Sequence, residues 1–464
     1  MEEWAARISR VTVNHFMNVS HGQIKFPCTM KGRNANPFEG ADILGIYGQN
    51  GSGKTAFIYC LNVLKKCLSG MPLGQDLDQF IQIGEKEAVL DFCITIKVGI
   101  QIADMFYHII LRRDESHDGA SIVDEKLSIK FSGGRQHDIF HCVRKKELLP
   151  KKWRKVLTEG EENPVSQMDL YATQEVIFSQ HRSFIFSQKL SDLVDAVKEK
   201  LDKQAQIELD CFRTLITYGE ADLDVMGTKD MGFINLHMLQ PIHISISNAH
   251  QTAFGTIAIN IMGPSLIPAP LFKDVEGWVK EMNVVLTCLI PGMRLKLNNL
   301  GEELNGKGSP VIRSELVSVR GVNEIPIRYE SEGIKKILSF LQLFIRAYNV
   351  PAMTMVVDEL DAGIFEYLLG EMLGIFRDSG KGQIIFTSHN LRPLEVLDKD
   401  SIVFTTTDPD DRYTRLTYVK PNNNLRDLYY KTILLGGEDK ELYQETDRYE
   451  LGLALRKAGS HEKA

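Results

Sequence analysis

A glycine-rich segment near the start of the chain has the residue types and spacing of a phosphate-binding loop. Residues 48–55, Gly-Gln-Asn-Gly-Ser-Gly-Lys-Thr, match G-x-x-x-x-G-K-[ST] in full. They follow a short apolar run and precede a segment with apolar residues at helical spacing, which is the strand, loop and helix that the motif requires. Glycines let backbone N–H groups surround a polyphosphate, while Lys54 neutralises its oxygens and the Thr55 hydroxyl binds Mg²⁺. The residues expected to bind the nucleotide are Gly48, Gln49, Asn50, Gly51, Ser52, Gly53, Lys54 and Thr55.

Two adjacent carboxylates end an apolar run much later in the chain. Asp358 and Glu359 follow the strand-like residues 353–357. Asp358 would hold Mg²⁺, and Glu359 would polarise the attacking water. The next predicted strand, 383–387, is followed closely by His389, which would bring an imidazole to the neighbouring strand end. An Asp-Glu pair is also common at a solvated strand end, so the prediction depends on all these elements meeting at one edge of a sheet.

The segments between the motifs predict the elements that must position them. Apolar residues alternate with polar ones between about 87 and 143, which indicates an antiparallel sheet inserted after the first helix. Between 187 and 216 they recur every three to four residues, which predicts one long amphipathic helix. Apolar strands at 354–357 and 383–387, with a helical segment between them, favour a parallel sheet covered on both faces. The predicted fold class is therefore α/β.

The length of 464 residues allows three domains at about 150 residues each. We divide the chain into a first lobe with the glycine loop and the antiparallel sheet (1–185), a helical and irregular insertion (186–310), and a second lobe with the carboxylates and the histidine (311–464). No pattern explains residues 219–264.

Composition excludes several classes of protein. The 54 Lys and Arg against 61 Asp and Glu give 54 − 61 = −7, and 43% hydrophobic residues is typical of a globular chain, so global disorder is excluded. Seven cysteines without C-x-x-C spacing indicate free thiols in a reducing compartment. No stretch approaches the roughly 18–20 apolar residues that cross a bilayer, so we expect a cytoplasmic protein that makes no membrane contact.

One basic cluster interrupts this acidic chain. Residues 144–155 contain Arg144, two lysines after it, and Lys-Lys-Trp-Arg-Lys at 151–155. The cluster could bind DNA phosphates while Trp153 stacks on a base, or it could dock an acidic protein. A solvated helix face is the commoner explanation of such a cluster.

Taken together, the motifs resemble the ATPase heads of the ABC type, a branch of the P-loop NTPases. In this family the glycine loop is the Walker A motif, the Asp-Glu strand is Walker B, and the histidine senses the γ-phosphate, which is the role implied for His389. A serine-glycine signature completes the partner's site across a nucleotide-sandwich dimer, and Ser331 and Gly333 stand at the matching position. An ordinary helix N-cap is the alternative reading of Ser331.

The resemblance also implies two further site residues. Asp361 matches the loop that connects the two sites of such a dimer. A glutamine usually reaches the metal, and Gln180 is the candidate here, with Gln174 as its rival.

The spacing of the motifs suggests a branch of the family. Lys54 and Asp358 lie 358 − 54 = 304 residues apart. The segments between them resemble those of the RecF and SMC branch of the ABC-type ATPases. The motif sequences resemble the OLD-like (AAA_15-type) ATPases of bacterial phage defence, whose nuclease members add a C-terminal TOPRIM domain. Asp408–Arg412 looks like a hairpin turn, because an alternating segment, 413–419, follows it at once. Only about 45 residues remain after that segment, too few for a TOPRIM domain. We therefore expect an ABC-ATPase head with inserted antiparallel sheet and helices, and no TOPRIM domain.

These observations predict an ATPase that uses ATP and Mg²⁺ and assembles as a homodimer or a higher homo-oligomer. One reading is a phage-defence sensor that controls a separate effector, such as a toxin or a nuclease. A second is a DNA-repair ATPase that binds duplex DNA. The third is a nuclease with a metal site in residues 219–310.

Overall fold

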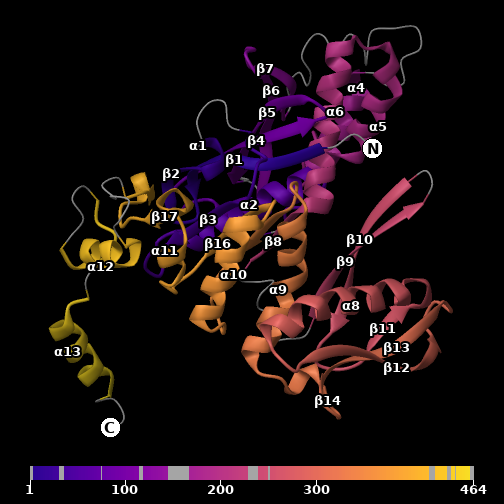
Figure 1. The fold of residues 1–464 in the computed structure, drawn as a ribbon. Coiled ribbons are helices and arrows are strands. Elements are labelled where there is room, and N and C mark those ends of the chain that lie inside the picture. Colours follow the sequence, from indigo (N-terminus) through magenta and orange to yellow (C-terminus); the bar gives the residue numbers. More distant parts are fainter. Residues whose placement is uncertain are drawn as a thin grey trace.

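The computed structural model of the chain describes residues 4–30, 36–74, 76–113, 119–144, 167–227, 239–248, 251–416, 424–435, 440–444 and 446–459. Two six-stranded sheets, a smaller sheet and a separate hairpin are joined by helices (Figure 1).

The six-stranded sheet that carries the glycine loop is mostly parallel. Its strand order is β18-β17-β3-β16-β15-β8, and only β18 runs antiparallel to its neighbour. The strands are β3 (Asp42–Tyr47), β8 (Leu223–Met226), β15 (Thr354–Val357), β16 (Gln383–Thr387), β17 (Ile402–Thr405) and β18 (Tyr413–Thr414). Because β3 lies between β16 and β17, the glycine loop meets segments from the last quarter of the chain. The predicted parallel sheet is confirmed, whereas β8 falls in the stretch that no pattern explained.

Successive side chains of these strands enter two hydrophobic cores on opposite faces of the sheet, as the period of a strand requires. Leu44 and Ile46 of β3 belong to the first core, and Ile43 and Tyr47 to the second. The first core includes α2 (Lys54–Leu68) and the antiparallel sheet, and the second includes α9 (Glu332–Asn349) and α10 (Glu366–Ser379). The α/β class and the coverage of both faces are therefore as predicted.

The second six-stranded sheet is antiparallel throughout, with the order β2-β1-β4-β5-β6-β7. Its strands are β1 (Trp4–Phe16), β2 (Val19–Lys25), β4 (Glu87–Val98), β5 (Gln101–Arg113), β6 (Ala120–Phe131) and β7 (His137–Val143). The predicted inserted sheet is confirmed and is extended by β1 and β2 from the start of the chain.

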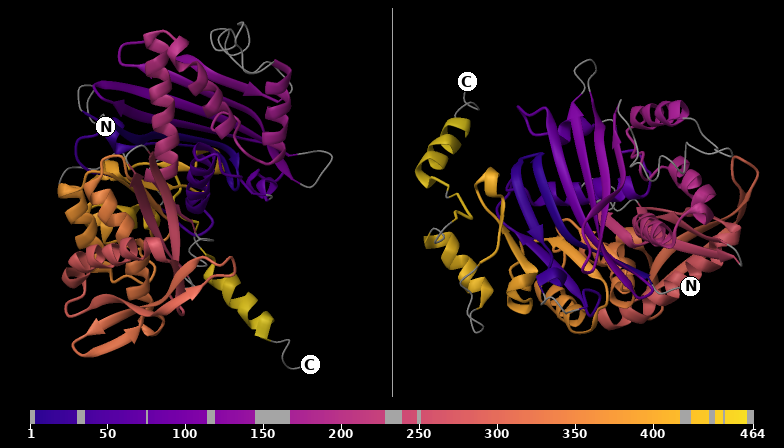
Figure 2. Two further views of the ribbon diagram at one scale, coloured as in Figure 1. Left: turned by 90° about the vertical axis from the view of Figure 1, so that its right-hand side faces the viewer. Right: turned by 90° about the horizontal axis from the view of Figure 1, so that it is seen from above.

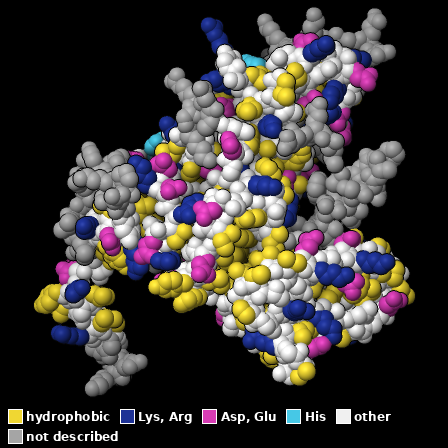
Figure 3. Space-filling view, in the orientation of Figure 1, with side chains coloured by type: hydrophobic (Ala, Val, Ile, Leu, Met, Phe, Trp, Pro, Cys, Tyr) yellow, Lys and Arg dark blue, Asp and Glu magenta, His cyan; other side chains and the backbone are white. Residues whose placement is uncertain are grey.

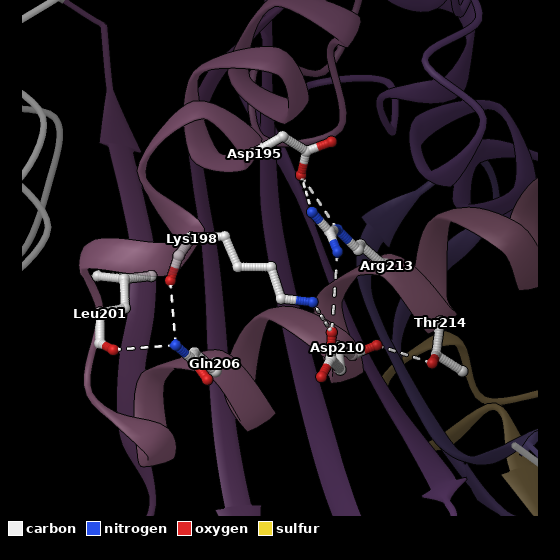
Figure 4. A network of polar contacts seen from close by, with 7 residues as sticks. All are labelled: Asp195, Lys198, Leu201, Gln206, Asp210, Arg213 and Thr214. Carbon is white, nitrogen blue, oxygen red and sulfur yellow. Dashed lines mark hydrogen bonds and ion pairs between the residues drawn. The ribbon is translucent and has the colours of Figure 1, made fainter.

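The expected single helix over 187–216 is wrong. The structure has two helices, α5 (Gln188–Val197) and α6 (Lys203–Thr217). Helix α6 packs on the antiparallel sheet, and the buried side chains of α5 belong to the same hydrophobic core. The break follows from Asp202, whose side chain accepts a hydrogen bond from the N–H of Ala205 and so caps a new helix. Figure 4 shows the contacts that tie the two helices together, including the ion pairs Lys198–Asp210 and Arg213–Asp195.

A smaller sheet with the order β11-β13-β12 lies at the far end of the molecule from the antiparallel sheet (Figure 2). Its elements are β11 (Ser265–Pro268), β12 (Arg294–Leu304), β13 (Pro310–Arg320), β14 (Asn323–Pro326), which pairs with β13, and the covering helix α8 (Phe272–Leu289). A separate hairpin joins β9 (Leu239–Asn248) to β10 (Gln251–Asn260). The predicted insertion 186–310 is thus divided among the antiparallel sheet, the parallel sheet and this smaller sheet.

The last helix projects from the rest of the molecule (Figure 1). Figure 3 shows hydrophobic side chains on both sides of α13 (Arg448–Gly459), and Tyr449, Leu451 and Leu455 are exposed. The other α-helices among the described residues are α1 (Pro27–Met30), α4 (Gln167–Ser179), α11 (Pro393–Val396) and α12 (Leu425–Leu435). In the described part of the chain, no helix has the length and apolar character needed to cross a membrane.

Candidate nucleotide site

The glycine loop turns sharply between β3 and α2. All six residues of β3 are buried, so the strand delivers the loop from a fixed position in the core. Gly51 and Gly53 have φ angles of +77° and +94°, a left-handed conformation that residues with a Cβ rarely adopt. No side chain caps the helix that starts at Lys54. Its first N–H groups are therefore available to an anion at the helix N-terminus.

The hairpin of β17 and β18 holds the loop from the side. The hydroxyl of Thr405 is 2.5 Å from that of Ser52, and the Tyr413 hydroxyl donates to the carbonyl of Gly53 at 2.9 Å. A Cβ at Gly48 would lie only 1.7 Å from the Thr405 hydroxyl, so this position requires glycine. These contacts fix the loop in its turned shape.

A pocket of about 580 Å³ opens between the glycine loop and the ends of the parallel strands. Its volume lies in the range of ordinary ligand sites. It is lined by Met17, Asn18, Asn50, Gly51, Gly53, Lys54, Thr55, Ala56, Gln79, Ile81, Ile83, Asp358, Glu359 and His389. The structure thus brings the predicted loop, the carboxylate pair and the histidine to one cavity.

Lys54 lies inside the loop. Its amino group donates to the carbonyls of Gly48 and Gln49 at 2.7 and 2.9 Å. Burial lowers the pKa of Lys54, and the negative charges of Asp358 and Glu359 oppose this shift. A phosphate in the pocket would supply a stronger, charge-assisted partner for the ammonium group.

Thr387 fixes the two carboxylates at the end of β15. Its hydroxyl donates to Asp358 Oδ1 at 2.5 Å and accepts the N–H of Glu359 at 2.7 Å. Asp358 is buried, and Glu359 is exposed with a φ of +50°. A left-handed glutamate is uncommon and costs free energy, so the surrounding hydrogen bonds must hold it. The two carboxylates therefore lie in different environments, one in the core and one facing the solvent.

Asp361 braces the loop that carries the histidine. Its carboxylate accepts the backbone N–H of His389 at 3.2 Å and that of Asn390 at 3.0 Å. The His389 side chain is exposed and lines the pocket, whereas Asp361 is not among the lining residues. Within one chain, Asp361 therefore fixes the backbone of the loop that carries His389 and does not itself contact the pocket.

Ser331 and Gly333 lie at the start of α9. The Ser331 hydroxyl accepts the N–H of Ile334 at 3.4 Å, so the serine is a helix N-cap, and it is exposed. A Cβ at Gly333 would lie 2.5 Å from the carbonyl oxygen of Gly363, in the loop after Asp361. Neither residue lines the pocket of its own chain.

Gln180 lies elsewhere. It follows α4, its backbone N–H bonds to Ile177 in the same helix, and its exposed side chain does not line the pocket. Its rival Gln174 is buried and donates to the sulfur of Cys142. The structure corrects both predictions because α4 packs on β6 of the antiparallel sheet.

The glutamine in the pocket is Gln79, between α2 and β4. The adjacent Phe80 accepts a hydrogen bond at its carbonyl from the N–H of Met17 at 2.7 Å, which brings this segment to the β1–β2 turn. No sequence pattern marks Gln79, Met17, Asn18, Ile81 or Ile83, because this contact between distant segments exists only in the fold.

Two other predictions have different outcomes. Asp408–Arg412 is a hairpin turn as expected, since Thr405 of β17 pairs with Tyr413 of β18. Most of the basic cluster, residues 145–155, lies outside the described residues. Arg144 is described, and it pairs with Glu175.

No protein-family model and no curated protein matches the sequence. Among solved structures, an Smc head bound to the C-winged helix domain of ScpA is 14% identical, with 89% of this chain and 98% of that chain covered and a TM-score of 0.39. An Smc head domain with an extended coiled coil bound to the C-terminal domain of ScpA, derived from Pyrococcus furiosus, is 13% identical, with 89% and 96% covered and a TM-score of 0.40. The recombination mediator protein RecF is 12% identical, with 90% and 100% covered and a TM-score of 0.37. With TM-scores this low, these similarities carry no conclusion about what the chain binds or does.

Proposed function

We propose that this chain is an ABC-type ATPase that binds ATP with Mg²⁺ and hydrolyses it. The observation that carries the proposal is the pocket itself, because Lys54, Glu359 and His389 line one cavity although they come from distant parts of the sequence. A chance glycine turn would not require a carboxylate pair and an imidazole at the same cavity.

The residues of the pocket fit the two ligands. Glycine N–H groups and Lys54 would bind the phosphates, while the Thr55 hydroxyl and the Asp358 carboxylate offer the oxygen ligands that Mg²⁺ prefers. When bound, Mg²⁺ would neutralise the charge on the phosphate oxygens. Glu359 would accept a hydrogen bond from the attacking water, and His389 would donate one to the γ-phosphate.

We also infer that two chains assemble around the nucleotides, with Ser331 and Gly333 of each chain completing the site of the other. The support is their position at an exposed helix N-terminus, which suits an anionic γ-phosphate, together with the motif resemblance. Asp361 would then lie at the contact between the two sites.

The replacement Glu359→Gln tests the proposed reaction. It should reduce ATP turnover by about 10²–10⁴-fold while ATP remains bound, because the side chain keeps its shape but can no longer take up a proton. Phosphate release and binding of a fluorescent ATP analogue measure the two effects. In contrast, Lys54→Ala should weaken nucleotide binding itself, by roughly 10- to 100-fold. Turnover by Glu359→Gln at the wild-type rate would refute the assignment.

For the biological role, we propose a phage-defence sensor ATPase in the cytoplasm that controls a separate effector, on the strength of the OLD-like motifs. The alternative is a DNA-repair ATPase. Native mass measurement after purification distinguishes them, since a second polypeptide bound to the ATPase supports the first role. ATP-dependent, salt-sensitive binding of duplex DNA supports the second.

A further inference from the structure

Three segments from distant parts of the chain meet beside the nucleotide pocket: the turn between β1 and β2, the glycine loop, and the β17–β18 hairpin. Arg412, in the turn of this hairpin, contacts both of the other segments and is only 7% exposed. Its backbone N–H also donates to the carbonyl of His21 in β2 at 3.1 Å. The residue is therefore fixed at the junction of the three segments.

The guanidinium group of Arg412 connects the hairpin to the β1–β2 turn. Its Nη1 donates to the carbonyl of Thr406 at 2.8 Å, within the same hairpin. Its Nη2 donates to the carbonyl of Asn18 at 2.9 Å. Because a guanidinium is planar and holds its N–H groups in a fixed fork, the bond to Thr406 sets the direction of the bond to Asn18. The backbone of the β1–β2 turn is thereby held in a defined position relative to the hairpin.

The same side chain borders the glycine loop. A Cβ on Gly53 would lie 3.2 Å from Cγ of Arg412 and 3.0 Å from a methyl group of Val19, so both side chains lie against this glycine. The Asn18 side chain in turn donates to the carbonyl of Gly51. Asn18, Gly51 and Gly53 line the pocket, whereas Arg412 does not. Arg412 thus supports two walls of the pocket from outside it.

Arg415 shows what a similar arginine does nearby. It donates to the carbonyl of Lys25 at 2.6 Å and to that of Asp400 at 3.3 Å. Lys25 ends β2 at the opposite end of the strand from the Asn18 turn, and neither Lys25 nor Asp400 lines the pocket. Both arginines therefore connect the end of the chain to the β1–β2 hairpin through backbone carbonyls, but Arg412 does so at the pocket.

We propose that Arg412 is a positioning residue for nucleotide binding, whose guanidinium group holds the β1–β2 turn against the glycine loop and so sets the shape of the pocket. This inference rests on the proposed ATPase function. Arg412 does not touch the nucleotide in this account, and it acts through Asn18 and the glycine loop. The carboxylate pair is held separately, by Thr387. The effect of Arg412 should therefore fall on binding more than on the chemical step.

The test compares Arg412→Met with Arg415→Met, since each removes one guanidinium group that bonds to two backbone carbonyls. Arg412→Met should weaken the binding of a fluorescent ATP analogue and raise KM for ATP by roughly tenfold, because less fixed pocket walls must be ordered when the nucleotide binds. Its kcat should stay within about threefold of wild type. Arg415→Met should keep binding, KM and kcat within about threefold of wild type, although both variants should lose a similar amount of melting temperature.

Arg412→Lys separates geometry from charge. It keeps the positive charge near the glycine loop, but a single ammonium group lacks the planar fork that joins Thr406 to Asn18. Its affinity for the ATP analogue should therefore stay several-fold below that of wild type. Full wild-type affinity in Arg412→Lys would show that only the charge matters, and would overturn the proposal.

A second measurement needs no nucleotide. In the nucleotide-free protein, backbone hydrogen exchange in peptides covering 14–22 and 48–57 should be several-fold faster in Arg412→Met than in wild type or Arg415→Met. Equal ATP affinities and equal exchange rates of the two methionine variants would also overturn the proposal. If the wild-type protein binds no ATP, the proposed function fails, and the exchange comparison alone decides the role of Arg412.

Discussion

Thr387 shapes the end of β15, where the proposed catalytic carboxylates lie, through its single hydroxyl group. This group bonds to Asp358 and to the backbone of Glu359, so one side chain sets the geometry of both carboxylates. The backbone of Glu359 is left-handed, which makes this hydrogen bond more important than an ordinary one.

Thr387→Val keeps the shape of the side chain and removes the hydroxyl. It should destabilise the fold by about 1–3 kcal/mol and lower kcat at least tenfold, because Asp358 and the Glu359 N–H lose a buried partner. Thr354→Val is a matched control, since Thr354 is also fully buried and hydrogen-bonded on β15, at the opposite end of the strand. Melting curves should show a similar loss for both variants, whereas kinetics should single out Thr387→Val. A normal kcat in Thr387→Val would contradict the role of the hydroxyl.

Among single residues, those that belong to a local sequence motif could be predicted. Lys54, Asp358 and His389 were placed correctly because each follows a strand of the same parallel sheet, and those strands end at one edge. Gln180 was misplaced because a single glutamine has no local pattern. Gln79 reaches the pocket only through a backbone contact near the β1–β2 turn.

Among the elements, a charge cluster with buried carboxylates and partly exposed cations joins α2, β8 and α9. Lys65 pairs with Asp224 at 2.7 Å, and Arg346 pairs with Asp222 at 2.9 Å and with Asp224 at 3.7 Å. The helix that begins at the glycine loop is thus connected to the helix that begins at Ser331.

Asp222 gives this cluster a pH dependence. Burial raises the pKa of Asp222 from 3.8 to about 6, despite the opposing charge of Arg346. The folded protein therefore binds this proton more tightly than the unfolded chain, and the contribution of Asp222 to stability falls as pH rises from about 4 to 6. Relative to Asp222→Asn, wild type should lose roughly 2 kcal/mol of unfolding free energy between about pH 4 and pH 7. Urea unfolding of both proteins measures the difference, and parallel pH curves would show the account of Asp222 to be wrong.

The type of an element was predictable where the alternation of apolar and polar residues continues over a long stretch, as in the strands β4, β5 and β6 (Figure 1). The separation of α5 from α6 was not, because both helices continue the same apolar stripe and only the Asp202 cap interrupts it. The strand β8 was missed because Asp222 precedes it and Asp224 interrupts its apolar residues, whereas β15, which is equally short, has no charged residue within it.

At the scale of the whole molecule, the proposed nucleotide site requires two chains, because Ser331 and Gly333 of one chain complete the site of the other. Because the Glu359→Gln protein should keep its ATP, adding ATP with Mg²⁺ should convert it to a particle with at least twice the mass, as measured by light scattering. Ser331→Ala in that background should weaken this assembly. Ser187→Ala is a matched control, since Ser187 caps α5 as Ser331 caps α9, and each loss costs about 1 kcal/mol of stability. Equal assembly of both double variants would argue against a contact through Ser331.

The central claim is that segments some three hundred residues apart close around one triphosphate. A structure of the Glu359→Gln protein with ATP and Mg²⁺ tests it most directly. The account predicts the phosphates within hydrogen-bond distance of the Lys54 amino group, with the metal between the Thr55 hydroxyl and Asp358. A nucleotide bound elsewhere, or phosphates that contact the glycine loop while Asp358 and His389 point away, would contradict it.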